Sequence, residues 1–372
     1  MKKNSKVLFL LHLPPPVHGS SIVGKLIRDS KLINDSFDTK YINLLISRSV
    51  DESGKTSVFK LFRFIASWFK LFFKLIIEKP NLCYFALTAT GSAFYKDVTL
   101  VFLLKLFRVK TVFHLHNKGV RKNESNKINH FLYRYIFNNN NVILLSNYLY
   151  NDVKTFVPKN RVYICHNGVE NVVNKNRLNG NAESEPIKIL FLSNLIASKG
   201  VFVLIEACGI LQQKGYEFSC AFVGGEGDVN AHQFKSEVKR IGVKNVEYLG
   251  RKYGDEKNGV YLDADIFVLP TFYSNECFPL VLLEAMQYSL PIISTDEGGI
   301  KDIVEDGETG FIVKENDPNE LAEKLELLLN NKSLRLQMGN AGRMKYEKEF
   351  TLQAFETRLH EILLHLLLNQ ID

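Results

Sequence analysis

The sequence predicts an α/β protein made of two doubly wound domains, each built on a parallel sheet. Short apolar runs typical of buried strands alternate with longer helical stretches on both sides of one polar segment, residues 171–186. This alternation indicates Rossmann-like domains, because parallel strands need a long crossover between them. The chain has 372 residues, which is enough for two domains with a core each.

The first half of the chain defines a domain over residues 1–170. Residues 6–13 form a short apolar run that His12 interrupts and three prolines follow, so we interpret it as a buried strand and not as a signal peptide. A helix is expected from about Ser20. Further strands are expected at residues 40–44, 82–86, 111–116, 142–145 and 162–165.

The second half begins after residues 171–186, which are polar, lack periodicity and are interpreted as a linker. A second domain is expected over residues 187–351. Its strands are expected at residues 187–193, 220–223, 246–249, 266–269, 292–294 and 310–313. The chain ends in three predicted helices, over residues 318–330, 332–349 and about 352–368.

The formal net charge of +7 hides an asymmetry between the halves. Residues 1–170 hold 26 Lys and Arg against 10 Asp and Glu, whereas residues 171–372 hold 21 against 30. The basic half is therefore expected to meet an anionic partner. Nucleic acid is not expected, because the positive charges are interleaved with bulky aliphatic residues and no zinc-finger or RNP-type signature accompanies them.

Residues 57–77 predict an amphipathic helix that could lie on an anionic membrane surface. The rest of its surface is Phe, Leu, Ile and Trp68, and a wide apolar face beside a basic stripe is typical of interfacial helices. The alternative is a helix packed on the sheet with its lysines in solvent. No stretch is long enough to predict a membrane-spanning helix. The stripe is formed by Lys60, Arg63, Ser67, Lys70 and Lys74.

Cysteine and histidine spacing predicts neither disulfides nor a metal site. The five cysteines have no paired or CxxC spacing, so we expect free thiols in a reducing compartment. The nine histidines do not fall at metal-ligand spacings, so no metal is expected.

Candidate ligand contacts follow the strands, because ligands of doubly wound sheets bind beyond the carboxyl ends of the strands. Gly19 lies among small residues at a helix start, which lets backbone amides approach a phosphate, although such turns are common. His116 ends a strand, where a histidine without a ligand role is the alternative. Lys199 opens a helix after a strand and would serve as a point charge for phosphate.

Two carboxylates, Glu276 and Glu284, flank a predicted helix start whose first residue is expected to be Pro279. Helix amides and the helix dipole favour an anion there. A diphosphate between two hydroxyl-rich sugars would match this arrangement, so the stretch predicts a nucleotide-sugar site. The alternative is a capping Glu276 and a Glu284 paired with some lysine.

The motif ECFPLVLLE, with its Glu-x7-Glu spacing, is followed by AM, a small or polar pair, LP, a strand and the Gly298-Gly299 loop. It resembles the retaining glycosyltransferases of family four, the glycosyl transferases group 1. The resemblance implies the GT-B fold, in which two Rossmann-like domains face each other across a cleft. It also implies that the last helix, about 352–372, packs back on the first domain.

The resemblance implies roles for individual residues. Glu276 and His116 would act on the transferred sugar, and Glu284 would bind the ribose of the donor. His116 matches the family better than His114, which we expect to point to the other side of the strand. The diphosphate would lie on Gly19, Lys199 and the amides of Cys277, Phe278, Pro279 and Leu280.

Two positions depart from the family pattern. Gly19 stands alone where a Gly-Gly pair is frequent, and Asn194 stands where an arginine usually meets the donor diphosphate. Arg251, which follows the strand at 246–249, is expected to compensate for that charge. A non-catalytic nucleotide-sugar-binding or membrane scaffold therefore stays open as an alternative, as does another GT-B enzyme such as an epimerase or phosphorylase.

The resemblance also implies the partners. The co-substrate would be a nucleotide-diphosphate sugar, with a UDP-sugar as the first candidate. Neither a metal nor another cofactor is expected. The acceptor follows instead from the positive charge of the first half and from residues 57–77: we expect a saccharide or a lipid-linked saccharide, met by a cytoplasmic protein that residues 57–77 hold on the inner face of the cell membrane.

Overall fold

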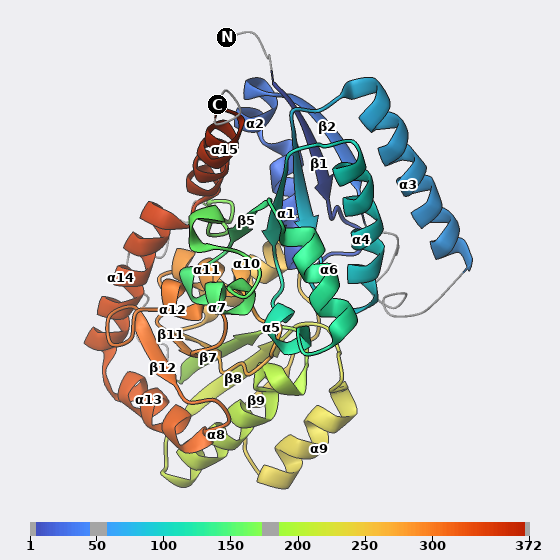
Figure 1. Cartoon of the computed structure of the whole chain (residues 1–372). Coiled ribbons are helices and arrows are strands. Elements are labelled where there is room, and N and C mark those ends of the chain that lie inside the picture. The colour runs from blue at the N-terminus through green and yellow to red at the C-terminus, as the bar shows by residue number, and fades with distance from the viewer. Residues whose placement is uncertain (1–4, 45–57, 173–185, 369–372) are drawn as a thin grey trace. The chain divides into compact units, whose positions relative to one another are not determined.

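The computed structural model describes residues 5–44, 58–172 and 186–368, apart from the side chains of residues 58–61. The chain divides into two compact units, unit 1 of Met1–Gly168 with Leu352–Asp372 and unit 2 of Val169–Thr351. Each unit contains a six-stranded parallel sheet with helices on both of its faces (Figure 1). The predicted α/β class with two parallel sheets is therefore confirmed, and every predicted strand is present with ends that differ by at most two residues.

The sheet of unit 1 has the strand order β2-β1-β3-β4-β5-β6. Its strands are continuous apolar runs because helices cover both faces, and all residues of β3 are buried. The first strand ends ahead of the three prolines, which cannot donate to a sheet ladder. The strands are β1 Lys6–Leu11, β2 Asp38–Asn43, β3 Leu82–Leu87, β4 Thr111–Leu115, β5 Asn141–Leu144 and β6 Val162–Ile164.

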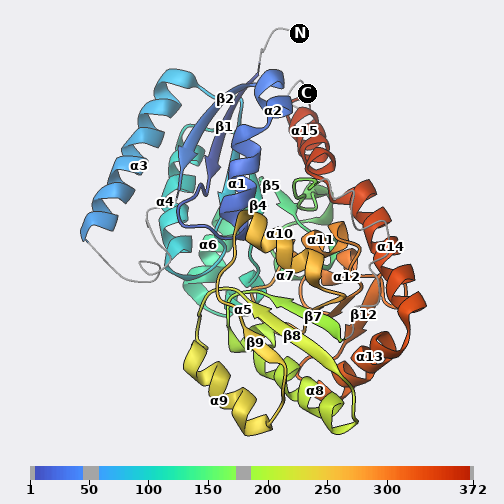
Figure 2. The ribbon, with the colours of Figure 1, turned by 180° about the vertical axis from the view of Figure 1, so that it is seen from behind.

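Helices α4 and α6 cover one face of this sheet and α1 covers the other (Figures 1 and 2). The chain leaves β1 towards β2 but leaves β3 towards β4, and right-handed crossovers then put the helices on opposite faces. The helices are α1 Gly19–Asp29, α2 Lys31–Ser36, α3 Val58–Glu78, α4 Gly91–Leu106, α5 Val120–Asn123, α6 Lys127–Phe137, α7 Tyr150–Val153 and α15 Leu352–Leu368.

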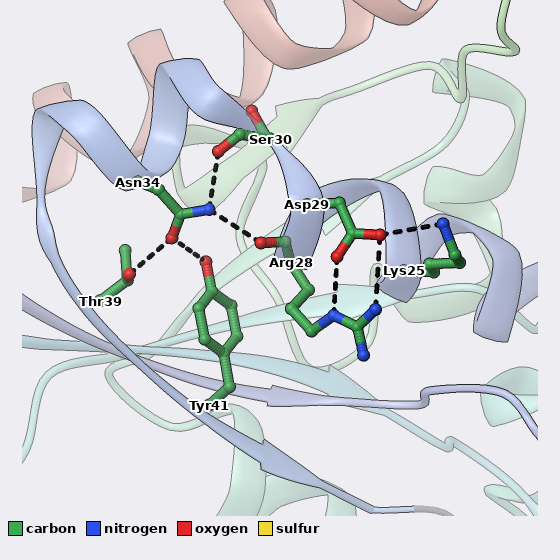
Figure 3. A network of polar contacts seen from close by, with 7 residues as sticks. All are labelled: Lys25, Arg28, Asp29, Ser30, Asn34, Thr39 and Tyr41. Atoms are coloured by element: carbon green, nitrogen blue, oxygen red, sulfur yellow. Dashed lines mark hydrogen bonds and ion pairs between the residues drawn. The ribbon is translucent and has the colours of Figure 1, made fainter.

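One asparagine fixes the corner where α1, α2 and β2 meet (Figure 3). The Asn34 side-chain amide donates to the carbonyl oxygens of Arg28 at 2.8 Å and Ser30 at 2.7 Å. Its own carbonyl oxygen accepts from the hydroxyls of Thr39 at 2.6 Å and Tyr41 at 2.9 Å. All four hydrogen-bonding positions of the side chain are used, which fixes the path from α1 into β2.

The exposed side of α3 is apolar. Leu71 and Leu75 are buried, and the helix contacts α4 and β2. Three basic residues each directly follow an exposed phenylalanine: Arg63 follows Phe62, Lys70 follows Phe69 and Lys74 follows Phe73. No helix of the described ranges is long and apolar enough to cross a bilayer. The exposed large apolar residues of α3 are Phe62, Ile65, Phe69, Phe73, Ile76 and Ile77.

Helix α15 belongs to unit 1 although it ends the chain. The Lys110 ammonium donates to the Leu366 carbonyl oxygen at 2.6 Å, near the end of this helix. The His360 ring lies 5.5 Å from the Phe37 ring, beside α2. A segment that follows unit 2 in the chain therefore completes the packing of unit 1.

The sheet of unit 2 has the order β12-β11-β10-β7-β8-β9. Its strands are β7 Ile187–Leu192, β8 Phe218–Val223, β9 Val246–Tyr248, β10 Ile266–Leu269, β11 Ile292–Thr295 and β12 Gly310–Val313. Its helices are α8 Val201–Gln213, α9 Ala231–Ile241, α10 Gly254–Asp263, α11 Leu280–Gln287, α12 Ile300–Ile303, α13 Pro318–Asn330 and α14 Lys332–Glu349.

Candidate functional site

The carboxyl ends of β7 and β10 form the switch point of unit 2, where the strand order reverses. Loops that leave such a pair of strands diverge, which makes the switch point the usual ligand position of α/β sheets. Lys199 follows β7 and Glu276 follows β10. Their side chains form an ion pair and are only 14% and 10% exposed. The Lys199 ammonium also lies 4.8 Å from the centre of the Tyr273 ring.

Two glycines let the loops around this pair touch backbone to backbone. Gly200 has φ of +87°, and a Cβ there would collide with the Pro270 carbonyl oxygen. Gly298 has φ of +64°, and a Cβ there would collide with the Glu276 carbonyl oxygen. The absence of a side chain at both positions brings the loops after β7, β10 and β11 together.

Glu284 lies on α11 and is held by two side chains of α10. Its carboxylate accepts from Lys257 Nζ at 2.6 Å and from the Tyr261 hydroxyl at 2.9 Å. Tyr261 stacks on Tyr288 with ring centres 5.2 Å apart. Burial, and then the charge of Glu284, raises the pKa of Tyr261, so its hydroxyl stays a donor. Apart from their i, i+4 spacing on α10, nothing in the sequence distinguishes Lys257 and Tyr261 as partners of Glu284.

The start of α11 differs from its prediction by one residue. Pro279 precedes the helix, with an extended ψ of 117°, and Leu280 is the first helical residue. Cys277 and Phe278 are each 4% exposed, and the Phe278 ring lies 5.8 Å from the Phe350 ring. Their side chains therefore belong to the core, and a ligand would meet the backbone of this segment.

Asn194 and Arg251 lie on either side of the glycine-rich exit of β8. The Asn194 side-chain oxygen accepts from the Gly225 amide at 3.1 Å, so Asn194 fixes the loop. A Cβ on Gly225 would collide with the Arg251 guanidinium, which therefore lies directly against this glycine. Arg251 is exposed. Asn194 and Arg251 therefore both lie against Gly225.

The candidates of unit 1 lie at the carboxyl edge of its own sheet. Gly19 is the first residue of α1, and a Cβ there would meet nothing within 4 Å. Gly24, one turn further, leaves no such room, because a Cβ there would collide with the His12 carbonyl oxygen. Gly19 is therefore open to the surroundings of unit 1, whereas Gly24 lets α1 pack on the end of β1.

The expectation that His114 points away from His116 is wrong. The two rings lie 4.2 Å apart, because residues two apart on a strand share a face. His114 is fully buried, and its Nδ1 lies 2.5 Å from the Tyr84 hydroxyl. His116 follows β4 and is half-buried, so it remains the more accessible of the two.

Two further histidines, His12 and His18, join His116 at this edge and were not singled out from the sequence. Burial, then the neighbouring His18 and His116, lowers the pKa of His12 to about 3. Burial, then His18, lowers the pKa of His116 to about 4. The cluster is therefore uncharged at neutral pH. The only sign of this cluster in the sequence is the position of its members: His12 and His116 directly follow strands β1 and β4, and His18 directly precedes α1.

An open cavity of about 650 Å³ lies elsewhere in unit 2, between β7, β8, β9 and α10. Lys188, Ser219 and Glu247 line it, all near the amino ends of strands, and no residue predicted for the site lies in its wall. Within the described ranges, no three His, Cys, Asp or Glu side chains are arranged to hold a metal ion.

Comparison with known proteins gives a family match in the second half of the chain. Residues 173–345 match the family model of the glycosyl transferases group 1. An uncharacterized glycosyltransferase of Methanocaldococcus jannaschii is 31% identical over 59% of this chain. The amylovoran biosynthesis glycosyltransferase AmsK of Erwinia amylovora is 31% identical over 55% of this chain. The alignments span 59% and 51% of these relatives' own lengths.

The fold of the whole chain has solved counterparts. HepE of Anabaena, determined in complex with UDP, aligns with a TM-score of 0.74 and 16% identity over 96% of this chain and 99% of HepE. The chain therefore has the GT-B fold with two Rossmann-like domains, and its residues 173–345 are similar to the glycosyl transferases group 1.

Proposed function

We propose that this chain is a retaining glycosyltransferase that moves a sugar from a nucleotide-diphosphate sugar to a saccharide or lipid-linked acceptor. The observation that carries the proposal is the Lys199–Glu276 pair at the switch point of unit 2, followed by the helix with Glu284. UDP bound to HepE supports a UDP-sugar as the donor. The similarity to AmsK supports a role in cell-surface polysaccharide synthesis.

In this proposal the bound donor breaks the Lys199–Glu276 ion pair and gives each side chain a new partner. The diphosphate replaces Glu276 as the partner of Lys199, and hydroxyls of the transferred sugar replace the ammonium as the partner of Glu276. The first amides of α11 add donors to the phosphates, since helix N-termini favour anions. Glu284 accepts from the ribose hydroxyls, and Arg251 supplies the cation that Asn194 lacks.

Transfer then depends on charge that develops on the leaving diphosphate. Preorganised donors such as the Lys199 ammonium and the α11 amides stabilise this charge without needing a metal ion. Retention follows from attack on the same face of the sugar, with the leaving phosphate accepting the proton of the acceptor hydroxyl. Gly19 and His116 contact ligand groups at the carboxyl edge of the unit 1 sheet.

Nucleotide release from a panel of UDP-, GDP- and ADP-sugars, with and without lipid extract and with EDTA present, tests the proposal. We expect release from one base class, stimulated by the extract, and a product whose anomeric proton has the configuration of the donor sugar by NMR. Silence across the panel would contradict the transferase. An inverted product would contradict retention, and loss of activity in EDTA would contradict metal independence.

The acceptor is proposed to reach the protein at the inner face of the cell membrane, where α3 docks on anionic lipid. Phe69 and Phe73 are 50% and 56% exposed in the middle of the helix. Lys70 and Lys74 follow each of them by one residue, so lysines border the apolar row. An exposed phenylalanine row without a basic border would fit a protein partner, whereas the two together fit an anionic bilayer surface.

Co-sedimentation with vesicles of neutral and of anionic lipid tests the docking. Replacing Lys70 and Lys74 by Glu removes at least two favourable charges of about 1 kcal/mol each, so binding to anionic vesicles should weaken roughly thirty-fold. The matched control replaces the exposed Lys122 and Lys127 of the same unit by Glu. Equal binding to both vesicle types, or an equal effect of the control, would remove the membrane from the proposal.

A further inference from the structure

The ring of Tyr273 is a second partner of the Lys199 ammonium. Tyr273 follows β10, and Lys199 Nζ lies over the face of its ring, 4.8 Å from the ring centre. The face of an aromatic ring attracts a cation, and most strongly where water is excluded. Because the Lys199 side chain is mostly buried, this attraction is only weakly screened. The ammonium therefore has two attractive partners, the Glu276 carboxylate and the Tyr273 ring.

The loop that carries this ring is joined to the backbone on both sides of Lys199. The Phe272 amide donates to the carbonyl oxygen of Ser198, directly before Lys199, at 2.7 Å. Gly200, directly after Lys199, packs against the backbone of Pro270. Neither contact involves a side chain of the ion pair. They consequently hold the loop in place whether or not the ion pair is formed.

A turn in the main chain sets the place of the ring itself. The Glu276 amide donates to the Tyr273 carbonyl oxygen at 2.7 Å, and the Tyr273 amide donates to the Thr271 hydroxyl oxygen at 3.2 Å. Both bonds use the main chain of Tyr273. Its phenol oxygen lies 3.5 Å from Asn275 Nδ2, which is a long distance for a hydrogen bond. The ring position therefore depends on the turn and not on the Glu276 carboxylate.

We propose that Tyr273 is a positioning residue, which holds the Lys199 ammonium at the switch point after a diphosphate has displaced Glu276 from it. This inference rests on the proposed transferase function. A carboxylate partner cancels the charge of the ammonium, whereas the ring is neutral and leaves that charge to the anion. The ring also attracts the cation without taking up a particular N–H group, so the N–H groups can point to phosphate oxygens. A lysine side chain has a long flexible stem, so without the ring the ammonium would lose its fixed place.

Thermal unfolding tests the contact without any ligand. Glu276→Gln removes the carboxylate, as the bound donor is proposed to do. In this background Tyr273→Leu should lower the unfolding temperature by a further 4–8 °C, roughly the loss of one desolvated cation–π contact in a unit of this size. Tyr273→Phe keeps the ring and should not lower it. When Lys199→Met is added to the background, Tyr273→Leu should cost clearly less. An equal cost with and without Lys199 would overturn the contact.

Calorimetry with UDP tests the positioning role in protein that keeps Glu276. Tyr273→Leu should weaken UDP binding roughly ten-fold, and Tyr273→Phe should bind UDP like the wild type. In a Lys199→Met background, Tyr273→Leu should cause little further loss, because the ring then has no cation to hold. The matched control is Phe311→Leu, which removes the contact of Lys324 Nζ with the Phe311 ring at 4.9 Å on β12 and should leave UDP binding unchanged.

Two results would overturn the positioning role. Unchanged UDP binding in Tyr273→Leu would show that the ring does not serve the site. The same loss of binding with and without Lys199 would show that the ring contacts the ligand itself.

Transfer kinetics separate this role from the proposed function. In Tyr273→Leu, kcat/KM for the donor should fall roughly ten-fold, and Tyr273→Phe should restore it. Absence of sugar transfer in a wild type whose UDP binding depends on Tyr273 would refute the proposed function and leave the positioning role in place. Transfer with wild-type kinetics in Tyr273→Leu would refute the positioning role alone.

Discussion

The Lys199–Glu276 pair predicts that stability and activity separate in a double variant. Removing one partner of a mostly buried ion pair leaves the other charge without compensation and costs about 3 kcal/mol. At 14% and 10% exposure the pair belongs near the low end of that effect. In a unit of this size, about 3 kcal/mol lowers the unfolding temperature by roughly 6–12 °C. Lys199→Met and Glu276→Gln should each show this shift.

The double variant Lys199→Met/Glu276→Gln should recover most of the unfolding temperature, because neither side chain is left charged. Its transfer rate should stay at least about 100-fold below the wild type, the usual cost of losing a preorganised charge at a transition state. Calorimetry and nucleotide release measure the two effects. The matched control is the Lys214–Glu326 pair at the surface, whose loss should leave the unfolding temperature close to that of the wild type, because water screens such pairs. A double variant that transfers sugar at the wild-type rate would show that the pair serves stability and not transfer. Single variants with an unchanged unfolding temperature would refute the cost assigned to an uncompensated buried charge.

Three further outcomes are expected. Gly298→Ala should lower the free energy of unfolding of unit 2 by more than about 2 kcal/mol, because the added Cβ collides with a backbone oxygen and φ is +64°. Gly242→Ala is the control, since its φ is +74° but a Cβ there meets open space, and it should cost about 1 kcal/mol. Thermal unfolding measures both, and equal losses would refute the collision. The pKa of His12 is lower in the folded state than in the unfolded state, so the unfolded state binds the proton first as the pH falls. The free energy of unfolding should therefore drop by about 2 kcal/mol between pH 6.5 and 4.5. A His12→Asn variant whose free energy of unfolding depends on pH as steeply as the wild type's would contradict this. Tyr261→Phe should weaken UDP binding roughly five-fold by calorimetry because it releases the α11 carboxylate, whereas Tyr216→Phe, which releases the exposed carboxylate of Glu326, should leave it unchanged.

The sequence predicts backbone position better than side-chain partners. Parallel strands are continuous apolar runs in this chain, so their place and type follow from hydrophobicity alone. The same rule puts Lys199 and Glu276 at one sheet edge, because strands that run parallel end on the same side. The helical period of three to four residues also predicts α3, and its exposed apolar residues Phe62, Ile65, Phe69 and Phe73 follow one another at that spacing.

Partners that depend on the packing of distant elements leave no such periodic trace. The Lys257–Glu284 contact depends on how α10 packs against α11. It joins a single residue of each helix, and one residue alone creates no periodic pattern in the sequence. The bond from Asn194 to the Gly225 amide likewise depends on two loops separated by a whole helix. The side of the strand on which His114 lies does follow from the sequence, because residues two apart on a strand share a face, as the rings of His114 and His116 do.

The place of α15 has a consequence for biosynthesis. Most of unit 1 leaves the ribosome before unit 2, yet the ring contact of His360 with Phe37 and the bond from Lys110 to Leu366 require residues made after all of unit 2. Unit 2 can complete its own sheet before those residues exist. The surfaces of α2 and of the Lys110 turn that α15 covers therefore stay unpaired while unit 2 is translated, so unit 1 starts its synthesis before unit 2 and completes its packing after it.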